Sequence, residues 1–362
     1  MAAISARSDL ELQVVIGGSA IVEPFGNVEP FLAADGYQPA ARILMNLGGG
    51  TNVAMAKTAG LAALEFTTVL ENLKPDLVVV RGDRYEMLPI TMAAVYMNLP
   101  VAHLEGGDLS GTIDDSVRHA ITKLAHLHLV STAEAATRVR QMGESPKHIF
   151  VVGAPEIELV KKNSFRTSEK FINYLGVGDV INLQKPFLTV MQHPVTTEVE
   201  SARAQIDETL EAIHRLGLPT IWFWPNADAG TDDISKGIRA FREKYQPAHV
   251  RFLKYLPAEQ FIGLLKKTAC LVGNSSAGLK EAAFLGLPVV NIGTRQAGRH
   301  RGQHLRDVGY NWRAIVRAVR EQVATGRYPS DRYLYQPESS RRVAEILATA
   351  PLYRQKQFHD QV

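Results

Sequence analysis

The sequence predicts an α/β protein of two doubly wound domains that face each other across a cleft. Short apolar runs end abruptly in polar or glycine-rich clusters, which is typical of parallel strands buried on both faces. A helical pattern follows almost every run, so strands and helices alternate along the chain. This order occurs in both halves, and 362 residues suffice for two ordinary domains.

Composition narrows the classes of function. With 46% hydrophobic and 21% charged residues, the chain has the composition of a soluble globular protein. A net charge of +3 without a long basic run gives no reason to expect nucleic acid as a partner, although it suits an anionic substrate. We find no run of 18 apolar residues and no basic-then-apolar leader, so the sequence predicts neither a membrane span nor a signal peptide. The single cysteine, Cys270, lies in an apolar run and is expected in the core of a cytoplasmic protein.

The first elements follow from apolar patterning. Residues 2–8 look like the end of a helix and residues 10–16 like a strand. A helix is expected over 51–73, because Lys74 and Pro75 end its apolar pattern, and a strand over 77–80. The three glycines at 48–50 are a weak phosphate signal, and a plain loop is the favoured interpretation.

The stretch 78–123 carries the strongest indication of chemistry. Its two strand runs end at Asp83 with Arg84 and at Glu105, where parallel sheets place their ligands. Asp114 begins a predicted helix that also carries Arg118, so three acids from three segments could share one crevice. Any one acid could equally be a helix cap. Two glycines, Gly106–Gly107, favour the functional interpretation because they let backbone N–H groups approach a ligand.

The rest of the first half continues the alternation. Strands are expected at 126–130 and 149–152, with a helix over 133–142 between them. The polar stretch 161–182 lacks a strand pattern and marks a domain boundary. We therefore expect domains at 1–165 and 166–335, and a C-terminal segment, 336–362, whose helix packs back on the first domain.

The second half repeats the layout. Strands are predicted at 187–191, 219–224, 250–253, 270–272 and 289–292, and helices at 202–216, 232–244, 258–266 and 279–285. Ser275 and Ser276 stand before the last of these helices, whose free N–H groups and dipole would suit a phosphate, although they could simply cap it. Glu281 could accept bonds from ribose hydroxyls, and Arg295 suits a diphosphate.

These residues indicate acid–base chemistry on a nucleotide-activated compound. The second half would hold the nucleotide, the first would supply carboxylates, and His193 would carry a proton or contact phosphate. No metal-ligand spacing such as HExxH or paired CxxC is present, so no metal is required. His103, inside a buried strand, is expected to be structural, and His119 is left open between the two roles.

Five spaced motifs carry a family resemblance: RGDRYEM, HLEGGDLSGTIDDSVRHAITKLAHLHLVST, MQHPVTTE, PNADAG and VGNSSAGLKEAAFLGLPVVNIGTRQ. In this order the chain resembles the hydrolysing UDP-N-acetylglucosamine 2-epimerases over about residues 10–302. The resemblance implies two Rossmann-like domains of GT-B type. It also implies a reaction in which UDP is eliminated with loss of the C2 proton, and water then adds to the 2-acetamidoglucal to give N-acetylmannosamine.

The resemblance also assigns roles to residues. Asp83, Glu105 and Asp114 look like the acid–base carboxylates, Arg118 like their partner, and His193 like the group that assists departure of the diphosphate. The UDP contacts would be Ser275, Ser276, Glu281 and Arg295, with Arg84, Asn226 and Phe261 as weaker candidates. The family resemblance implies a nucleotide-sugar substrate, a homodimer, and no cofactor, nucleic acid or membrane partner.

One departure and several alternatives accompany this interpretation. Family members begin with a strand and a Gly-Thr/Ser-Arg-Ala loop, whereas Met1 here falls in the following helix, so we expect a first strand and a site arginine to be absent from this sequence. The alternatives are the same chemistry on a 2,4-diacetamido-trideoxy or GDP-linked sugar, a glycosyltransferase of the same fold, and an inactive nucleotide-sugar binder. A difference of one methyl or hydroxyl group shifts specificity by only ~1–3 kcal/mol, so the sequence does not separate the sugars.

Overall fold

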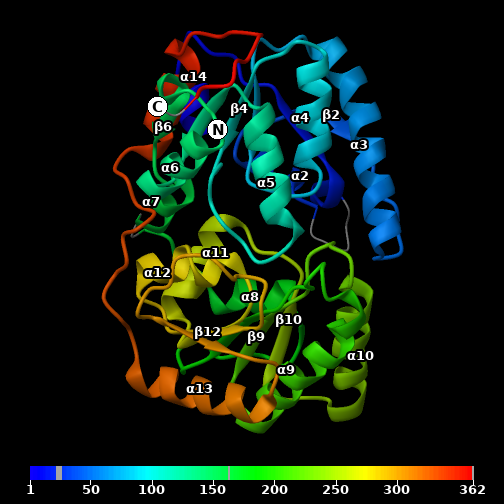
Figure 1. Cartoon of the computed structure of the whole chain (residues 1–362). Coiled ribbons are helices and arrows are strands. Elements are labelled where there is room, and N and C mark those ends of the chain that lie inside the picture. The colour runs from blue at the N-terminus through cyan, green and yellow to red at the C-terminus, as the bar shows by residue number, and fades with distance from the viewer. Residues whose placement is uncertain (22–26, 162–163, 361–362) are drawn as a thin grey trace.

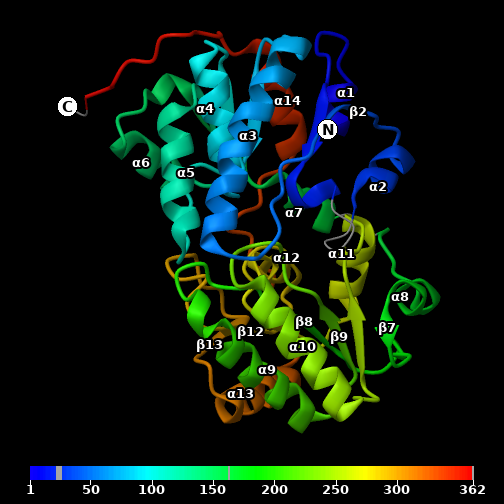
Figure 2. The ribbon, with the colours of Figure 1, turned by 90° about the vertical axis from the view of Figure 1, so that its right-hand side faces the viewer.

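The computed structural model describes residues 1–21, 27–161 and 164–360. It contains two α/β lobes, one above the other in Figure 1 and again after rotation in Figure 2. Strands β1 to β6 lie in the first lobe and β7 to β13 in the second. All strand pairs but one in the described part of the chain are parallel, so the predicted fold class is confirmed.

The strands of the first lobe form two sheets. Strands β3 (Val78–Arg81), β4 (Val101–Leu104), β5 (Leu127–Val130) and β6 (Ile149–Val151) form one parallel sheet in sequence order. Strands β1 (Val14–Gly17) and β2 (Pro39–Ile43) form a separate parallel pair. The expected strand at 10–16 is therefore displaced, because residues 10–13 make no strand pairing. No pairing joins β1 to β3 among the described residues, and Val79 of β3 is 45% exposed.

Helices cover this lobe on both sides: α1 (Ala2–Ser5), α2 (Glu29–Ala34), α3 (Asn52–Leu73), α4 (Met87–Tyr96), α5 (Ile113–Leu124), α6 (Ala133–Gln141) and α7 (Pro155–Lys161). Threonine hydroxyls at 51, 112 and 132 accept the first free N–H groups of α3, α5 and α6. Apolar side chains of α3 and α4, such as Phe66 and Ile90, pack with Val78 and Val80 of β3. This packing fixes the end of β3, where Asp83 follows.

Helix α3 is long and apolar enough to cross a membrane by length and composition. Only 22% of its most apolar 18-residue window is buried, and Val53 and Leu64 are exposed. The sequence predicted no membrane span because it contains no run of 18 apolar residues. Its buried residues, including Ala62, Phe66 and Leu70, belong to the core beneath the sheet. A single helix that meets this criterion by length and composition alone is weak evidence for a membrane.

One seven-stranded sheet organises the second lobe, in the order β13-β12-β11-β8-β9-β10-β7. Its strands are β7 (Val177–Gly178), β8 (Leu188–Met191), β9 (Thr220–Phe223), β10 (Val250–Leu253), β11 (Cys270–Gly273), β12 (Val289–Ile292) and β13 (Leu305–Val308). The edge strand β7 is antiparallel. Edge strands β7 and β13 were not predicted, because neither is an apolar run.

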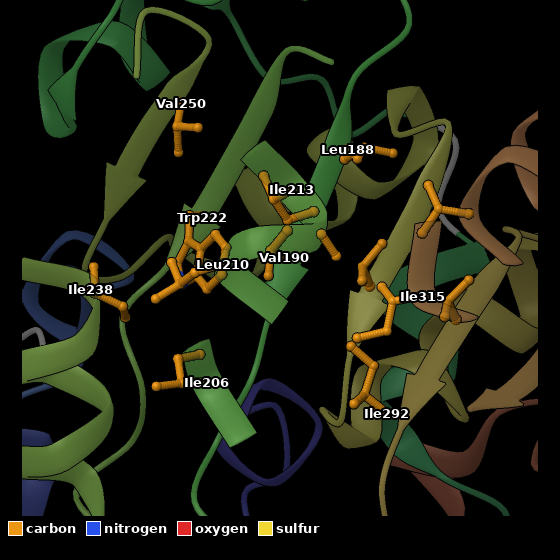
Figure 3. Packing of buried hydrophobic residues seen from close by; sticks show 14 of the residues in the cluster. Leu188, Val190, Ile206, Leu210, Ile213, Trp222, Ile238, Val250, Ile292 and Ile315 are labelled. Carbon is orange, nitrogen blue, oxygen red and sulfur yellow. The ribbon is translucent and has the colours of Figure 1, made fainter. Parts of the chain in front are cut away.

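The helices of this lobe are α8 (Glu169–Leu175), α9 (Ala202–Leu216), α10 (Thr231–Tyr245), α11 (Ala258–Lys267), α12 (Glu281–Leu285) and α13 (Trp312–Thr325). Figure 3 shows the core between sheet and helices, where Trp222 of β9 packs with Leu210 of α9 and Ile238 of α10. Cys270 is a fully buried part of this core, as expected.

The last helix, α14 (Ser339–Thr349), lies against the first lobe (Figure 1). Its Val343 and Leu347 pack with Leu127 and Leu129 of β5. Helix α14 also contacts α1 and α7. The boundaries at 165 and 335 stay predictions, and residues 162–163 of the expected linker lie outside the described residues.

Candidate active site

The two lobes touch where the strand-end loops of one meet those of the other. The Gly111 N–H donates to the Arg295 carbonyl at 3.1 Å, and the Gly230 N–H donates to the Gly50 carbonyl at 2.8 Å. A Cβ at Gly111 would lie 2.1 Å from the Thr294 carbonyl oxygen, so only glycine permits this approach. The loop after β4 is thereby held against the loop after β12.

Asp83 is paired with Arg118 immediately after β3. The guanidinium, only 2% exposed, bonds the Asp83 carboxylate and donates to the Asp108 carbonyl at 2.9 Å. Asp115 lies 3.5 Å from it on the same helix, and Arg299 of the second lobe approaches Asp83 at 3.9 Å. Arg118 therefore fixes both Asp83 and the loop after β4, and its role as partner of the reacting carboxylates stays a prediction.

Glu105 belongs to an ionic quartet that joins the lobes. We use "quartet" for Arg81, Glu105, Glu156 and Lys280. Glu105 contacts Arg81 at 2.6 Å and Lys280 at 2.7 Å, and Glu156 contacts the same two cations at 2.7 and 3.1 Å. Burial raises the pKa of the Glu105 carboxyl, but Lys280 and Arg81 offset this, and the net effect is a lowered pKa. Glu105 is thus an anion near neutral pH.

The backbone around Glu105 is unusual. Glu105 has a φ of 66°, a left-handed conformation that costs a non-glycine residue of the order of 1–3 kcal/mol. The two following glycines are also required by packing, and the approach of their N–H groups to a ligand stays a prediction. A Cβ at Gly106 would lie 2.9 Å from the Thr122 hydroxyl, and one at Gly107 would lie 2.4 Å from the Ala135 carbonyl.

A second ion pair between the lobes, Arg84–Asp228, lies near His193. Arg84 contacts Asp228, which follows β9, at 2.5 Å. Asp228 also accepts a hydrogen bond from the Asn226 side chain, and the Asn226 backbone N–H donates to His193 Nδ1 at 3.2 Å. Burial and the nearby Arg295 lower the pKa of His193 to about 3. The ring is therefore neutral with its proton on Nε2, which is ready to donate.

Asn274, which follows β11, holds His193 and Arg295 by hydrogen bonds. Its side chain accepts from the His193 N–H at 2.7 Å and donates to the His193 carbonyl at 2.9 Å. Its own carbonyl accepts from Arg295 at 3.2 Å and from Gln296 at 2.8 Å. One buried amide thus sets the relative positions of His193 and Arg295.

Two further acids have raised pKa values. Burial and the neighbouring Asp228 raise the pKa of Asp114, which stands in the first turn of α5. Burial raises the pKa of Asp108 to about 6 against the effect of Lys280. Asp108 lines a cavity of about 50 Å³ between the lobes together with Lys280 and Arg299. The acids at this interface thus differ in how readily they hold a proton.

The expected nucleotide loop is only partly as predicted. A 3-10 turn at Ser276–Gly278 follows Ser275, and α12 begins only at Glu281 with five residues. The prediction of free N–H groups is wrong for residues 277–280, because the Ser275 hydroxyl and the Ser275 and Ser276 carbonyls accept them all. So short a helix also has a weak dipole, which leaves the two hydroxyls and Arg295 as the groups suited to phosphate.

Glu281 and Phe261 also come from this side. The Glu281 Oε2 atom is buried without a hydrogen-bond partner, and burial raises its pKa. A buried acceptor without a partner is suited to a ligand hydroxyl. Phe261 of α11 packs edge-on against Phe223 with ring centroids 5.8 Å apart, so much of its surface is used within the lobe.

Sequence comparison places these residues in a known family. The sequence model of the UDP-N-acetylglucosamine 2-epimerase family matches residues 2–348. The chain belongs to that family. It is 34% identical to UDP-N,N'-diacetylbacillosamine 2-epimerase (hydrolyzing) of Legionella pneumophila, over 96% of this chain and 90% of that protein. It is 31% identical to UDP-N-acetylglucosamine 2-epimerase of Neisseria meningitidis, over 99% of this chain and 94% of that protein.

Solved epimerase structures share the fold. The crystal structure of the Methanocaldococcus jannaschii UDP-GlcNAc 2-epimerase in complex with UDP-GlcNAc and UDP superposes with a TM-score of 0.75 and 20% identity, over 96% of this chain and 94% of that one. The Neisseria meningitidis enzyme bound to UDP-GlcNAc superposes with a TM-score of 0.72 and 16% identity, over 95% and 93%. The GT-B-like arrangement expected from the sequence is therefore confirmed.

Within this epimerase family fold, several site residues were missed by the sequence analysis. Asp228, Asn274 and Lys280 lie inside the motifs PNADAG and VGNSSAGLKE, yet nothing in their spacing showed that they contact Arg84, His193 and Glu105. Asp108 stood next to Gly107 in the acidic cluster.

The structure also shows the surroundings of His103 and His119. His103 is buried with both ring nitrogens hydrogen-bonded, at 3.1 Å to Thr122 and 2.9 Å to Gly82, and is structural as predicted. His119 lies 3.5 Å from Asp115. Among the described residues, no three His, Cys, Asp or Glu side chains are grouped so that they could hold a metal ion.

Proposed function

We propose that the protein is a hydrolysing UDP-N-acetylglucosamine 2-epimerase, which converts UDP-N-acetylglucosamine to N-acetylmannosamine and UDP. One observation carries the proposal. The loops that carry acids after β3 and β4 of the first lobe meet the loops of the second lobe through the ion pairs Glu105–Lys280 and Arg84–Asp228, and Lys280 stands directly after the turn that carries Ser275 and Ser276. The hydrolysing and UDP-N-acetylglucosamine relatives at 31–34% identity support the reaction and the sugar.

The first step removes the C2 proton while the bond between C1 and the diphosphate oxygen breaks. A carboxylate of the set Asp83, Glu105 and Asp114 accepts the proton, and UDP leaves with the bonding electrons. Weakly acidic C–H groups need a well positioned base, and the Arg118 and Lys280 contacts hold two of these carboxylates in place. The product of this step is 2-acetamidoglucal.

The leaving diphosphate gains charge as UDP departs. His193 is neutral and carries its proton on Nε2, so it can donate a hydrogen bond to that charge without first being protonated. Arg295 and the hydroxyls of Ser275 and Ser276 complete the phosphate contacts, Arg84, Asn226 and Phe261 line the nucleotide, and Glu281 accepts from the ribose. In the second step, the hydroxyl group of water adds to C1. C2 receives a proton on the face opposite to the one from which the first proton was removed.

A second candidate substrate is UDP-N,N'-diacetylbacillosamine. The Legionella pneumophila relative at 34% identity carries that name, and the chemistry at C1 and C2 is the same. The two sugars differ away from the reacting carbons, so the same carboxylates and phosphate contacts would serve either one.

The test is proton NMR of the purified protein in D2O with each sugar nucleotide in turn. Free UDP together with an N-acetylmannosamine deuterated at C2 is the expected result with UDP-N-acetylglucosamine. A more than tenfold higher kcat/KM with the bacillosamine nucleotide would reassign the substrate. Transfer to an added acceptor without deuterium at C2 would refute the epimerase proposal and favour a glycosyltransferase.

The proposal includes a cytoplasmic homodimer, as the family resemblance suggests. Sedimentation equilibrium of the purified protein measures the mass against 39.8 kDa for one chain, and a single-chain mass would contradict the dimer. Cell fractionation with an antibody tests the cytoplasmic setting.

A further inference from the structure

The quartet described above joins the two lobes through four charged side chains, of which Arg81 is 52% exposed and the other three are largely buried. Arg81 and Glu105 come from β3 and the end of β4, Glu156 from α7, and Lys280 from the second lobe. The side chains of Lys280, Glu105 and Glu156 are only 11%, 10% and 12% exposed. Two cations face two anions, so the set is electrically balanced only while Lys280 is in place.

Lys280 occupies a special position in the chain. It lies between the 3-10 turn of the nucleotide loop, which includes Ser276, and Glu281, the first residue of α12. Its backbone N–H donates to the Ser276 carbonyl at 3.0 Å, while its ammonium group reaches Glu105 at 2.7 Å. One residue therefore contacts the proposed phosphate loop through its backbone and the proposed acid–base carboxylate through its side chain.

The energetics make this contact consequential. Burying an ammonium and two carboxylates costs several kcal/mol per ion, which only mutual pairing offsets. If the lobes separated, Lys280 would leave, and Glu105 and Glu156 would share Arg81 alone. The position of Glu105 is thus tied to the approach of the second lobe, and a shift of its carboxylate by ~1 Å would cost about 100-fold in rate.

We propose that Lys280 is a positioning residue that couples nucleotide binding on the second lobe to the placement of Glu105 on the first. A nucleotide bound at Ser275 and Ser276 holds the turn that carries Lys280 against the first lobe, and the ammonium group keeps Glu105 in the reactive position. The inference rests on the proposed function, because it assumes that this loop binds the nucleotide and that Glu105 takes part in the reaction.

The first test compares kinetics of Lys280→Gln with wild type and with Lys236→Gln. Lys236 is 63% exposed and pairs only weakly with Asp233, so its variant is the matched control. We expect Lys280→Gln to lose about 10–100-fold in kcat with KM and the UDP Kd changed less than about threefold. Lys280→Arg, which keeps the charge, should recover part of the loss. A Lys280→Gln kcat within threefold of wild type would overturn the proposal.

The pH profile separates positioning from simple loss of structure. The charged and titratable groups that face Glu105 are Arg81, Lys280, Glu156, Asp108 and His103. Among the described residues, removing Lys280 leaves Arg81 as the only cation in contact with Glu105, so the acid limb of kcat should move about 1–3 pH units upward. An unchanged limb would count against the role of Lys280.

The second test does not depend on turnover. Hydrogen exchange of residues 104–112 is followed with and without UDP, in wild type and in Lys280→Gln. UDP should slow exchange of this loop in wild type at least about tenfold and have no effect on it in the variant. If wild type processes neither sugar nucleotide, the proposed function fails. The exchange comparison still decides whether Lys280 couples UDP binding to the loop that carries Glu105. Equal protection in both proteins would refute it.

Discussion

His193 offers the sharpest test of the proposed chemistry. Its Nδ1 atom accepts the Asn226 N–H, so the donor of the neutral ring is Nε2. Asparagine at this position can accept the same N–H but has no atom at the place of Nε2. Glutamine can place an amide N–H there. We therefore expect His193→Asn to lose the donor to the diphosphate and His193→Gln to keep it.

The magnitude follows from the charge that develops on the leaving group. Removing one preorganised donor to such a charge costs about 10²–10³ in kcat, or ~2.7–4 kcal/mol. A pKa of about 3 means that fewer than about one ring in 10⁴ is protonated at pH 7.5, so the neutral ring is the form that acts. His193→Asn should therefore fall 10²–10³-fold in kcat, and His193→Gln less than about tenfold.

The assay is continuous detection of released UDP, checked by NMR for C2 deuteration. His359→Gln is the control, because His359 is an exposed residue of the C-terminal tail. Equal losses in His193→Asn and His193→Gln would refute donation from Nε2. A wild-type acid limb that disappears in His193→Gln would contradict the neutral ring.

Three further predictions follow from contacts in the structure. Asp83→Ala leaves the buried Arg118 without its main carboxylate partner and should lower the free energy of unfolding by ~3 kcal/mol, measured by urea denaturation, whereas a loss below ~1 kcal/mol would contradict this pairing. Gly111→Ala places a Cβ against the Thr294 carbonyl, so the lobes must move apart. We expect kcat/KM to fall at least about tenfold and small-angle scattering to show expansion. An unchanged scattering profile and rate would count against this contact between the lobes. Burial lowers the pKa of His103 to about 4 from an ordinary value near 6.5, so its contribution to stability is full above pH 6.5 and is lost as the pH falls toward 4. Between pH 7.5 and 5 this amounts to ~2 kcal/mol, and His103→Asn should show a correspondingly smaller loss of unfolding free energy; equal losses would refute the buried neutral ring.

Local pattern was enough for most of the fold. The central strands β4, β5, β8 and β11 are almost completely buried, so their uninterrupted apolar runs could be found in the sequence. The edge strands could not, since a strand such as Leu305–Val308 needs no apolar run when one side faces solvent. The strand prediction for residues 10–13 was wrong for a related reason: apolar alternation favours a strand but does not supply a neighbouring strand to pair with.

For the site, strand ends were predictable and partners were not. Asp83 and Glu105 were found because parallel sheets place chemistry after their strands. Lys280 contacts Glu105 and Asp228 contacts Arg84 from the other lobe, 175 and 144 residues away in sequence, and no local rule predicts such pairs. The N–H groups of the nucleotide loop were mispredicted because a 3-10 turn replaces the expected first turn of helix.

Helix α14 has a consequence for the order in which the chain can fold during synthesis. Leu127 and Leu129 are covered by Val343 and Leu347, which leave the ribosome more than 200 residues later, after all strands of the second sheet. The seven strands of that sheet lie together between Val177 and Val308, so it can close as soon as they have emerged. The lobe made first is therefore completed last: a nascent chain that has emerged up to residue 338 contains the described strands and helices of the second lobe, while Leu127 and Leu129 still lack the cover of α14.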